Sequence, residues 1–171
     1  GRGGGISVLA SDEIETAGLK LPPLPTNVQT ELRHVLPLPG SIFANPVDAS
    51  SLLSPETILP TMLQLGQLPD ISLLIYHRGF HPASRWGGSR VASAIPPKAL
   101  ADTFTQVQRT TGKPIILALN PATELAGMKD FLAAQEALVQ AGFPVFYSLH
   151  RAALALARLI AWNNHRTNSS P

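Results

Sequence analysis

The sequence contains no cysteine, and it has few charged residues. The absence of cysteine excludes disulfides, thiolate metal sites and a cysteine nucleophile, and it favours a reducing compartment such as the cytoplasm. Only 14% of the 171 residues are charged and 44% are hydrophobic, which excludes a disordered charged tail. With 13 basic and 11 acidic residues, the chain has no general attraction to nucleic acid.

Long apolar runs are also missing, so we expect no transmembrane helix. No secretory signal opens the chain, and the first residue is Gly1, which suggests a processed or incomplete amino terminus. The length suits one domain with a substantial core. We assign residues 1–162 to that domain and residues 163–171 to a polar tail or linker.

Short apolar runs alternate with longer stretches of helical periodicity, which is typical of βα units and a parallel sheet. The predicted strands are residues 71–76, 115–119 and 145–147, with a further short strand at 41–44. Helices are predicted at 6–17, at 26–36 with a Thr26–Gln29 capping box, after the cap residue Ser54, and at 97–110, 124–141 and 149–162.

One strand is missing from this pattern. Glycines 3–5 precede the first helix, but no strand precedes the glycines, although a doubly wound sheet normally begins with a strand, a glycine-rich turn and a helix. We therefore expect residues upstream of Gly1, or a partner chain, to supply a parallel strand beside residues 71–76. Without it, unpaired backbone groups would be buried, at a cost of about 1–3 kcal/mol each.

The glycine run is the first candidate site. Glycines before a helix let an anion approach free N–H groups at the positive end of the helix dipole. The run matches neither a dinucleotide fingerprint nor a phosphate loop, and a flexible terminus explains the glycines equally well. The candidate phosphate-binding residues are Gly3, Gly4, Gly5, Ile6 and Ser7.

Two further segments are candidates. Asn45 and Asp48 belong to an Asn-Pro-Val-Asp turn, which either bonds its own backbone or lies at the ligand-binding edge of the sheet. Residues 77–94 form a long predicted loop without acidic residues, and Arg78, Arg85 and Arg90 within it are candidate contacts for an anion, an acyl group or CoA. A solvated or partner-covered loop is the competing interpretation.

No catalytic residue is assigned. The histidines have no metal-ligand spacing, and no Ser/His/Asp set can be assembled. We therefore predict no metal site in this chain.

An ordered set of motifs resembles the NDP-forming (ADP-forming) acyl-CoA synthetases, relatives of succinyl-CoA synthetase. Residues 3–19, Gly-Gly-Gly-Ile-Ser-Val-Leu-Ala-Ser-Asp and then Glu-Thr-Ala-Gly-Leu, are similar to the family block Gly-Gly-Pro-Gly-Val-Leu-Ala-x-Asp…Glu-x-x-Gly-Leu. Further short matches follow in the family's order: Leu-Pro pairs at 21–25 and 36–37, Asn-Pro-Val-Asp at 45–48, Gly-Lys-Pro at 112–114, Ala-Gly-Phe-Pro-Val at 141–145 and Arg-Ala-Ala at 151–153.

The resemblance implies a flavodoxin-like, doubly wound parallel sheet in three α/β/α layers, here without its first strand. It implies a ligase domain that receives a phosphohistidine at the glycine-rich helix, with Asn45 and Asp48 lining the same face, and that is inactive alone. The domain would belong to an enzyme that catalyses acyl-CoA + ADP + phosphate ⇌ acid + CoA + ATP. Phosphate would be the one ligand of this domain, while CoA, ATP/ADP and Mg²⁺ serve the whole enzyme. The implied partners are a CoA-binding, phosphohistidine-bearing domain and an ATP-grasp domain, in an oligomer without nucleic acid or membrane.

Two other functions stay open. The domain could be a non-catalytic acyl-CoA- or phosphate-sensing module, such as the synthetase-like part of a protein acyltransferase. A free flavin-binding flavodoxin is disfavoured, because the glycine-rich turn lacks a Ser/Thr-rich phosphate loop.

Overall fold

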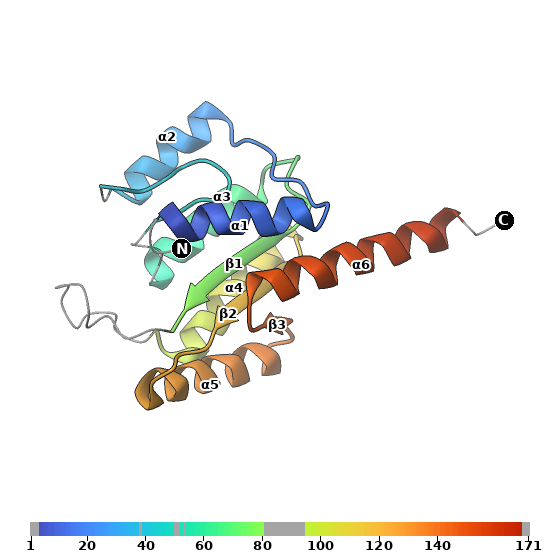
Figure 1. The fold of residues 1–171 in the computed structure, drawn as a ribbon. Helices are drawn as coiled ribbons and strands as arrows, with labels where there is room; N and C mark the ends of the chain where they lie inside the picture. Colours follow the sequence, from blue (N-terminus) through green and yellow to red (C-terminus); the bar gives the residue numbers. More distant parts are fainter. Residues whose placement is uncertain (1–3, 38, 50–51, 53, 81–94, 169–171) are drawn as a thin grey trace.

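The structure is a computed structural model that describes residues 4–37, 39–49, 52, 54–80 and 95–168. Helices and strands alternate through most of the chain (Figure 1). In chain order the elements are α1 (Gly4–Thr16), α2 (Thr26–Val35), α3 (Pro55–Gly66), β1 (Leu74–Gly79), α4 (Pro97–Thr111), β2 (Ile115–Asn120), α5 (Leu125–Gln140), β3 (Val145–Phe146) and α6 (Leu149–Asn168).

The three strands form one parallel sheet in the order β1-β2-β3. Leu74 pairs with Ile115 and Leu117 with Val145, so each strand lies beside the next strand in the sequence. This confirms the expected fold class: a parallel α/β domain that is consistent with a flavodoxin-like fold lacking strands.

Helices cover both faces of the sheet, because side chains alternate along buried strands. On one face, Ile115 and Leu117 of β2 pack with Phe104 of α4 and Leu138 of α5 in the main core. On the other face, the alternate residue Ile116 packs with α6 in a smaller cluster. Helix α1 lies beside α6 on this second side (Figure 1), which gives the three layers.

Strand β1 begins and ends about three residues later in the chain than the sequence predicted. It spans Leu74–Gly79 rather than residues 71–76, because its partner β2 begins only at Ile115, after Gly112 has turned the chain at φ 67°. The apolar run ends at Tyr76, but the ladder continues to the pair Gly79–Asn120. His77 and Arg78 therefore lie on a strand and not in the predicted loop.

Three other local predictions were wrong. No capping box forms at α2: the side chain of Gln29 donates to the Leu24 carbonyl at 2.9 Å. Residues 41–44 form only a single antiparallel bridge, Ile42–Asp48, within the described ranges. Helix α6 continues past Trp162 to Asn168, where the Arg166 guanidinium lies 4.7 Å from the centre of the Trp162 ring and supports the extra turns through an i,i+4 contact.

Candidate functional site

The candidate site lies at the carboxyl ends of β1 and β2, the edge at which open parallel sheets bind ligands. The first turn of α1 reaches this edge (Figure 1). The loop that contains Asp48 meets α1 there, because Ser7 donates a hydrogen bond to Asp48 Oδ2 at 3.1 Å. Two segments 41 residues apart in the sequence are thus joined.

The Ser7–Asp48 contact is buried. Ser7 is 7% exposed and Asp48 is 2% exposed, and the main chain of Asp48 is fixed by two hydrogen bonds with Ile42, of 2.7 and 2.9 Å. Removing the donor of a hydrogen bond to a buried carboxylate costs free energy, because the carboxylate is left without that partner. The contact therefore fixes the position of the α1 amino terminus relative to the sheet edge.

The glycines open the helix in the way that an anion site requires. Helix α1 begins at Gly4, and no acidic residue lies in its first turn. A Cβ added at Gly5 would meet nothing within 4 Å, so the backbone there is open to a ligand. Ile6 is 39% exposed. The first N–H groups of any helix lack partners within it, and this is the general feature by which helix amino termini attract anions. Gly3 lies outside the described residues.

His77 is the site residue that the sequence analysis missed. Its Nε2 lies 3.4 Å from Oδ1 of Asn120, on the neighbouring strand. Burial lowers the pKa of His77, while the Asn120 contact and the charge of Asp48 act in the opposite direction. Its position just after an apolar run could have indicated the carboxyl end of a strand.

The remaining candidates lie elsewhere or make structural contacts. The Asn45 amide donates to the Pro22 carbonyl at 3.0 Å, so Asn45 holds the proline-rich connector in place. The Arg78 guanidinium lies 4.8 Å from the centre of the Phe80 ring. Arg85 and Arg90 lie outside the described residues. Among the residues that the structure describes, no group of three or more His, Asp or Glu side chains could hold a metal ion.

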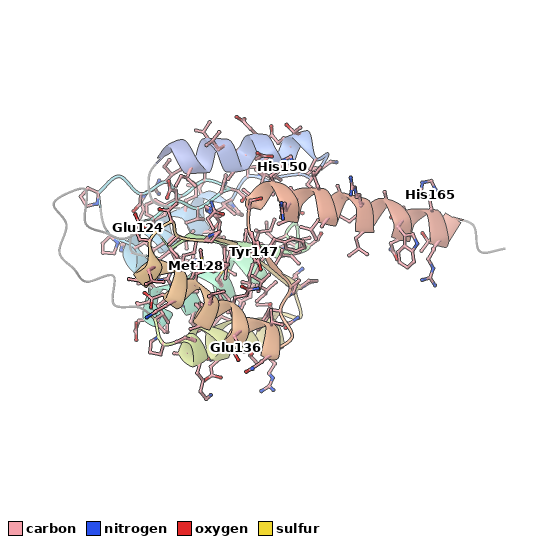
Figure 2. The ribbon with its side chains drawn as sticks, turned by 60° about the horizontal axis from the view of Figure 1, so that its bottom comes forward. Glu124, Met128, Glu136, Tyr147, His150 and His165 are labelled. Carbon is pink, nitrogen blue, oxygen red and sulfur yellow. The ribbon has the colours of Figure 1, made fainter. Side chains whose placement is uncertain are left out.

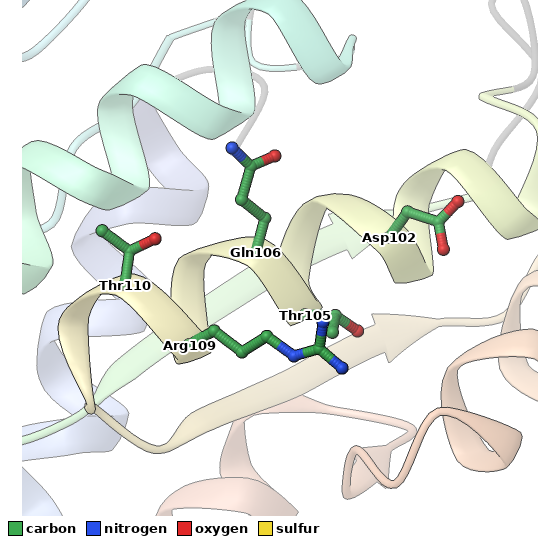
Figure 3. Close-up of a pocket in the computed structure, with 5 residues that line it drawn as sticks. All are labelled: Asp102, Thr105, Gln106, Arg109 and Thr110. Carbon is green, nitrogen blue, oxygen red and sulfur yellow. The ribbon is translucent and has the colours of Figure 1, made fainter.

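Two hollows border the described part of the fold. One, of about 390 Å³, is lined by five residues of the single helix α4, among them Asp102 and Arg109 (Figure 3). No other element contributes a residue to it within the described ranges. The other, of about 850 Å³, runs along β1 and also touches Ser7 and Asn120 of the candidate site. Only the larger hollow is continuous with the carboxyl edge.

Helix α6 is tied to α1 on the far side of the site. Nδ1 of His150, near the start of α6, lies 2.5 Å from a carboxylate oxygen of Glu13 in α1. His165 lies toward the other end of α6, which extends beyond the body of the fold (Figure 2). No helix in the described ranges is both long and apolar enough to cross a membrane.

Fold and site together define a parallel α/β domain with a glycine-opened helix at the carboxyl edge of its sheet. No protein-family model and no curated protein matches the sequence. Solved structures do share the fold: PH0766 from Pyrococcus horikoshii OT3 has a TM-score of 0.70 and 24% identity, over 93% of this chain and 33% of that chain.

The dinucleotide-forming acetyl-coenzyme A synthetase 1 of Ca. Korarchaeum cryptofilum is similar as well. Its apo form has a TM-score of 0.65 and 21% identity, over 97% of this chain and 33% of that chain. Its complex with phosphate and ADP gives the same score and identity, over 97% of this chain and 32% of that chain. The chain therefore spans about a third of the length of these proteins, and at such identities the likeness is one of fold.

Proposed function

We propose that this chain is the phosphate- and phosphohistidine-docking domain of an NDP-forming acyl-CoA synthetase. The observation that carries the proposal is the start of α1, where a glycine-opened helix with Gly5 in open space is held at the sheet edge by the Ser7–Asp48 contact. The fold likeness to an acetyl-coenzyme A synthetase supports it, since one of those structures contains phosphate and ADP.

The chemistry of this site is electrostatic. The N–H groups of Gly4, Gly5, Ile6 and Ser7 and the positive end of the α1 dipole would hold the charge of a phosphoryl group during transfer. The Ser7 side chain donates to Asp48, so Ser7 would serve the phosphate through its backbone N–H and by fixing the helix. No described side chain is needed as a nucleophile.

The rest of the reaction would belong to partner domains. The full conversion, acyl-CoA + ADP + phosphate ⇌ acid + CoA + ATP, needs a phosphorylatable histidine, a CoA site and a nucleotide site. We assign these, together with Mg²⁺, to a CoA-binding domain and an ATP-grasp domain in an oligomeric enzyme. The domain alone is then inactive, which agrees with its spanning about a third of its structural neighbours.

The test uses the complete natural enzyme with Gly5→Val. A Cβ at Gly5 would clash with nothing, so the variant should fold, but the β-branched side chain would occupy the space through which the phosphate approaches. We expect ATP formation from acyl-CoA, ADP and phosphate to fall by about 100-fold or more, as when preorganised donors are lost. Leu9→Val is the matched control, because Leu9 is 63% exposed on the same helix and its variant should keep full activity.

Two results would contradict the proposal. Undiminished ATP formation by Gly5→Val would remove the start of α1 from the reaction. A natural protein in which this domain is joined to an acetyltransferase, with no ATP formation from acyl-CoA, would instead establish the sensing module.

A further inference from the structure

Strand β1 has a strand partner on one side only. It lies at the edge of the order β1-β2-β3, and the larger hollow, which we call the β1 groove, follows its other side. All residues from Asp70 to Phe80 line this groove, together with one face of α1, among them Ile6, Ala10 and Ile14, and one face of α3, among them Ile58, Thr61 and Met62.

The backbone of β1 offers a regular ladder to this groove. Leu74 donates its N–H to Pro114 and Phe80 donates its N–H to Asn120, at 2.9 and 3.1 Å, so the even-numbered residues face β2. The N–H and C=O groups of Ile75, His77 and Gly79 then point to the opposite side, since neighbouring residues of a strand alternate. Within the described ranges, β1 pairs with β2 alone.

The groove is covered on two faces. Helix α1 lies over one side of β1 and α3 lies on the other (Figure 1). The lining is largely apolar, which suits an occupant that is apolar on both faces, as a central parallel strand is. The backbone groups of β1 that point into the groove require the edge of that occupant to be polar.

We infer that the β1 groove receives an apolar extended segment that immediately precedes residue 1 in the natural protein and adds to β1 as a parallel strand. Such a strand would match the six residues of β1, a length of about 20 Å. This assignment is independent of the proposed function, because it concerns how the sheet is completed and not what the carboxyl edge binds.

The direction of α1 identifies the source of the strand. Helix α1 begins at the carboxyl end of β1 and runs back toward its amino end (Figure 1). In agreement, Leu19, past the end of α1, and Leu73, just before β1, pack against the same hydrophobic cluster. A strand parallel to β1 in this groove would end where α1 begins, and the glycines would make a short connection. A second copy of the sheet edge does not fit, because its own flanking helices would meet α1 and α3.

Amide hydrogen exchange tests the inference in the complete natural protein and in the 171-residue chain. In the natural protein we expect the amides of Ile75, His77 and Gly79 to exchange as slowly as those of Tyr76 and Arg78. In the 171-residue chain we expect the three odd-numbered amides to exchange at least about tenfold faster. The even-numbered amides, which bond to β2, are the internal control.

A second measurement covers the case in which the shorter chain is unfolded and all five amides exchange fast. A synthetic peptide of the natural residues upstream of residue 1 is then added, and restored protection of the five amides supports the inference.

Three outcomes would overturn it. Equal protection of the odd-numbered amides in both proteins would show that the groove does not receive the upstream segment. Protection of the shorter chain by CoA, ADP or phosphate alone would assign the groove to a small molecule, and protection that rises with its concentration would assign it to a second copy. These exchange rates are measured on proteins that keep Gly5, and they do not depend on whether Gly5→Val loses phosphoryl transfer. The two proposals can therefore fail separately.

Discussion

Single side chains decide how the amino terminus of α1 is held. Ser7 is one of few buried polar residues in the described part of the chain, and it faces the nearly inaccessible carboxylate of Asp48. Asp48 in turn belongs to a loop that is closed on Ile42 by backbone hydrogen bonds. Loss of the Ser7 hydroxyl would thus affect a loop 41 residues further along the chain.

We predict that Ser7→Ala lowers the free energy of unfolding by about 1–3 kcal/mol, because a buried carboxylate loses a donor. The measurement is urea unfolding followed by circular dichroism. Ser11→Ala is the matched control: the Ser11 hydroxyl donates to the Ser7 carbonyl of its own helix, with no other partner among the described residues, and alanine favours helix. An equal loss in both variants would mean that the Ser7–Asp48 contact adds nothing to stability.

We predict that His77 makes the stability depend on pH below about pH 6.5. Burial lowers its pKa in the folded protein below the ordinary value of 6.5, so the unfolded chain takes up the proton first as the pH falls. We expect the full contribution of His77 above about pH 6.5 and its progressive loss from there down to the folded pKa.

The check is the unfolding free energy of wild type and His77→Gln between about pH 5.5 and 8. The variant should show a flatter profile below about pH 6.5. His34→Gln, at an exposed position of α2, should keep the wild-type profile. A His77→Gln profile as steep as that of the wild type would show that another group causes the pH dependence.

The sequence predicted part of this site. A glycine run before a helix and an Asn-Pro-Val-Asp turn are local signals, and both lie where the candidate site forms. The pairing of Ser7 with Asp48 depends on how the loop folds back, and no spacing encodes it. His77 was missed because a polar residue after an apolar run looks like the beginning of a loop.

At the scale of elements, the register of a strand depends on its neighbour. Periodicity located β2 and the helix α4 closely, and α4 ends at the turn residue Gly112. The bounds of β1 could not be obtained in that way, because its ladder with β2 begins at Leu74–Ile115 and continues through polar residues. A short segment such as residues 71–73, in which Ile71 is buried but Ser72 is exposed, can precede a strand without pairing.

Helix ends show the same limit. Ser54 occupies the position before α3 and Pro55 begins the helix, as predicted, but the Ser54 side chain makes no capping hydrogen bond there. The polar residues after Trp162 read as a tail, yet they continue α6 through side-chain contacts one turn apart, such as Arg166 on Trp162. A short run of polar residues is thus a weak signal for the end of a helix that already has several turns.

At the scale of the whole molecule, α6 has two halves with different surroundings. Its first half is packed on the sheet through Ala152, Ala153 and Leu156. From Arg158 to Thr167 every residue is exposed, including Leu159 at 58% and Trp162 at 53%. The second half therefore extends from the body of the fold, as Figures 1 and 2 show.

We predict that ending the chain after Trp162 leaves the free energy of unfolding within about 0.5 kcal/mol of its original value. The removed turns bury nothing in the described fold, and changes at exposed positions away from caps and cores have effects of this size.

Leu156→Ala is the contrasting variant in the same helix. Leu156 is 7% exposed and packs in a cluster with Ile116 and Ala118, and its truncation should cost about 2–5 kcal/mol. Urea unfolding measures both changes. A large loss on shortening the chain would mean that the residues after Trp162 pack against something in solution, and a concentration-dependent loss would identify that contact as a second copy of the chain.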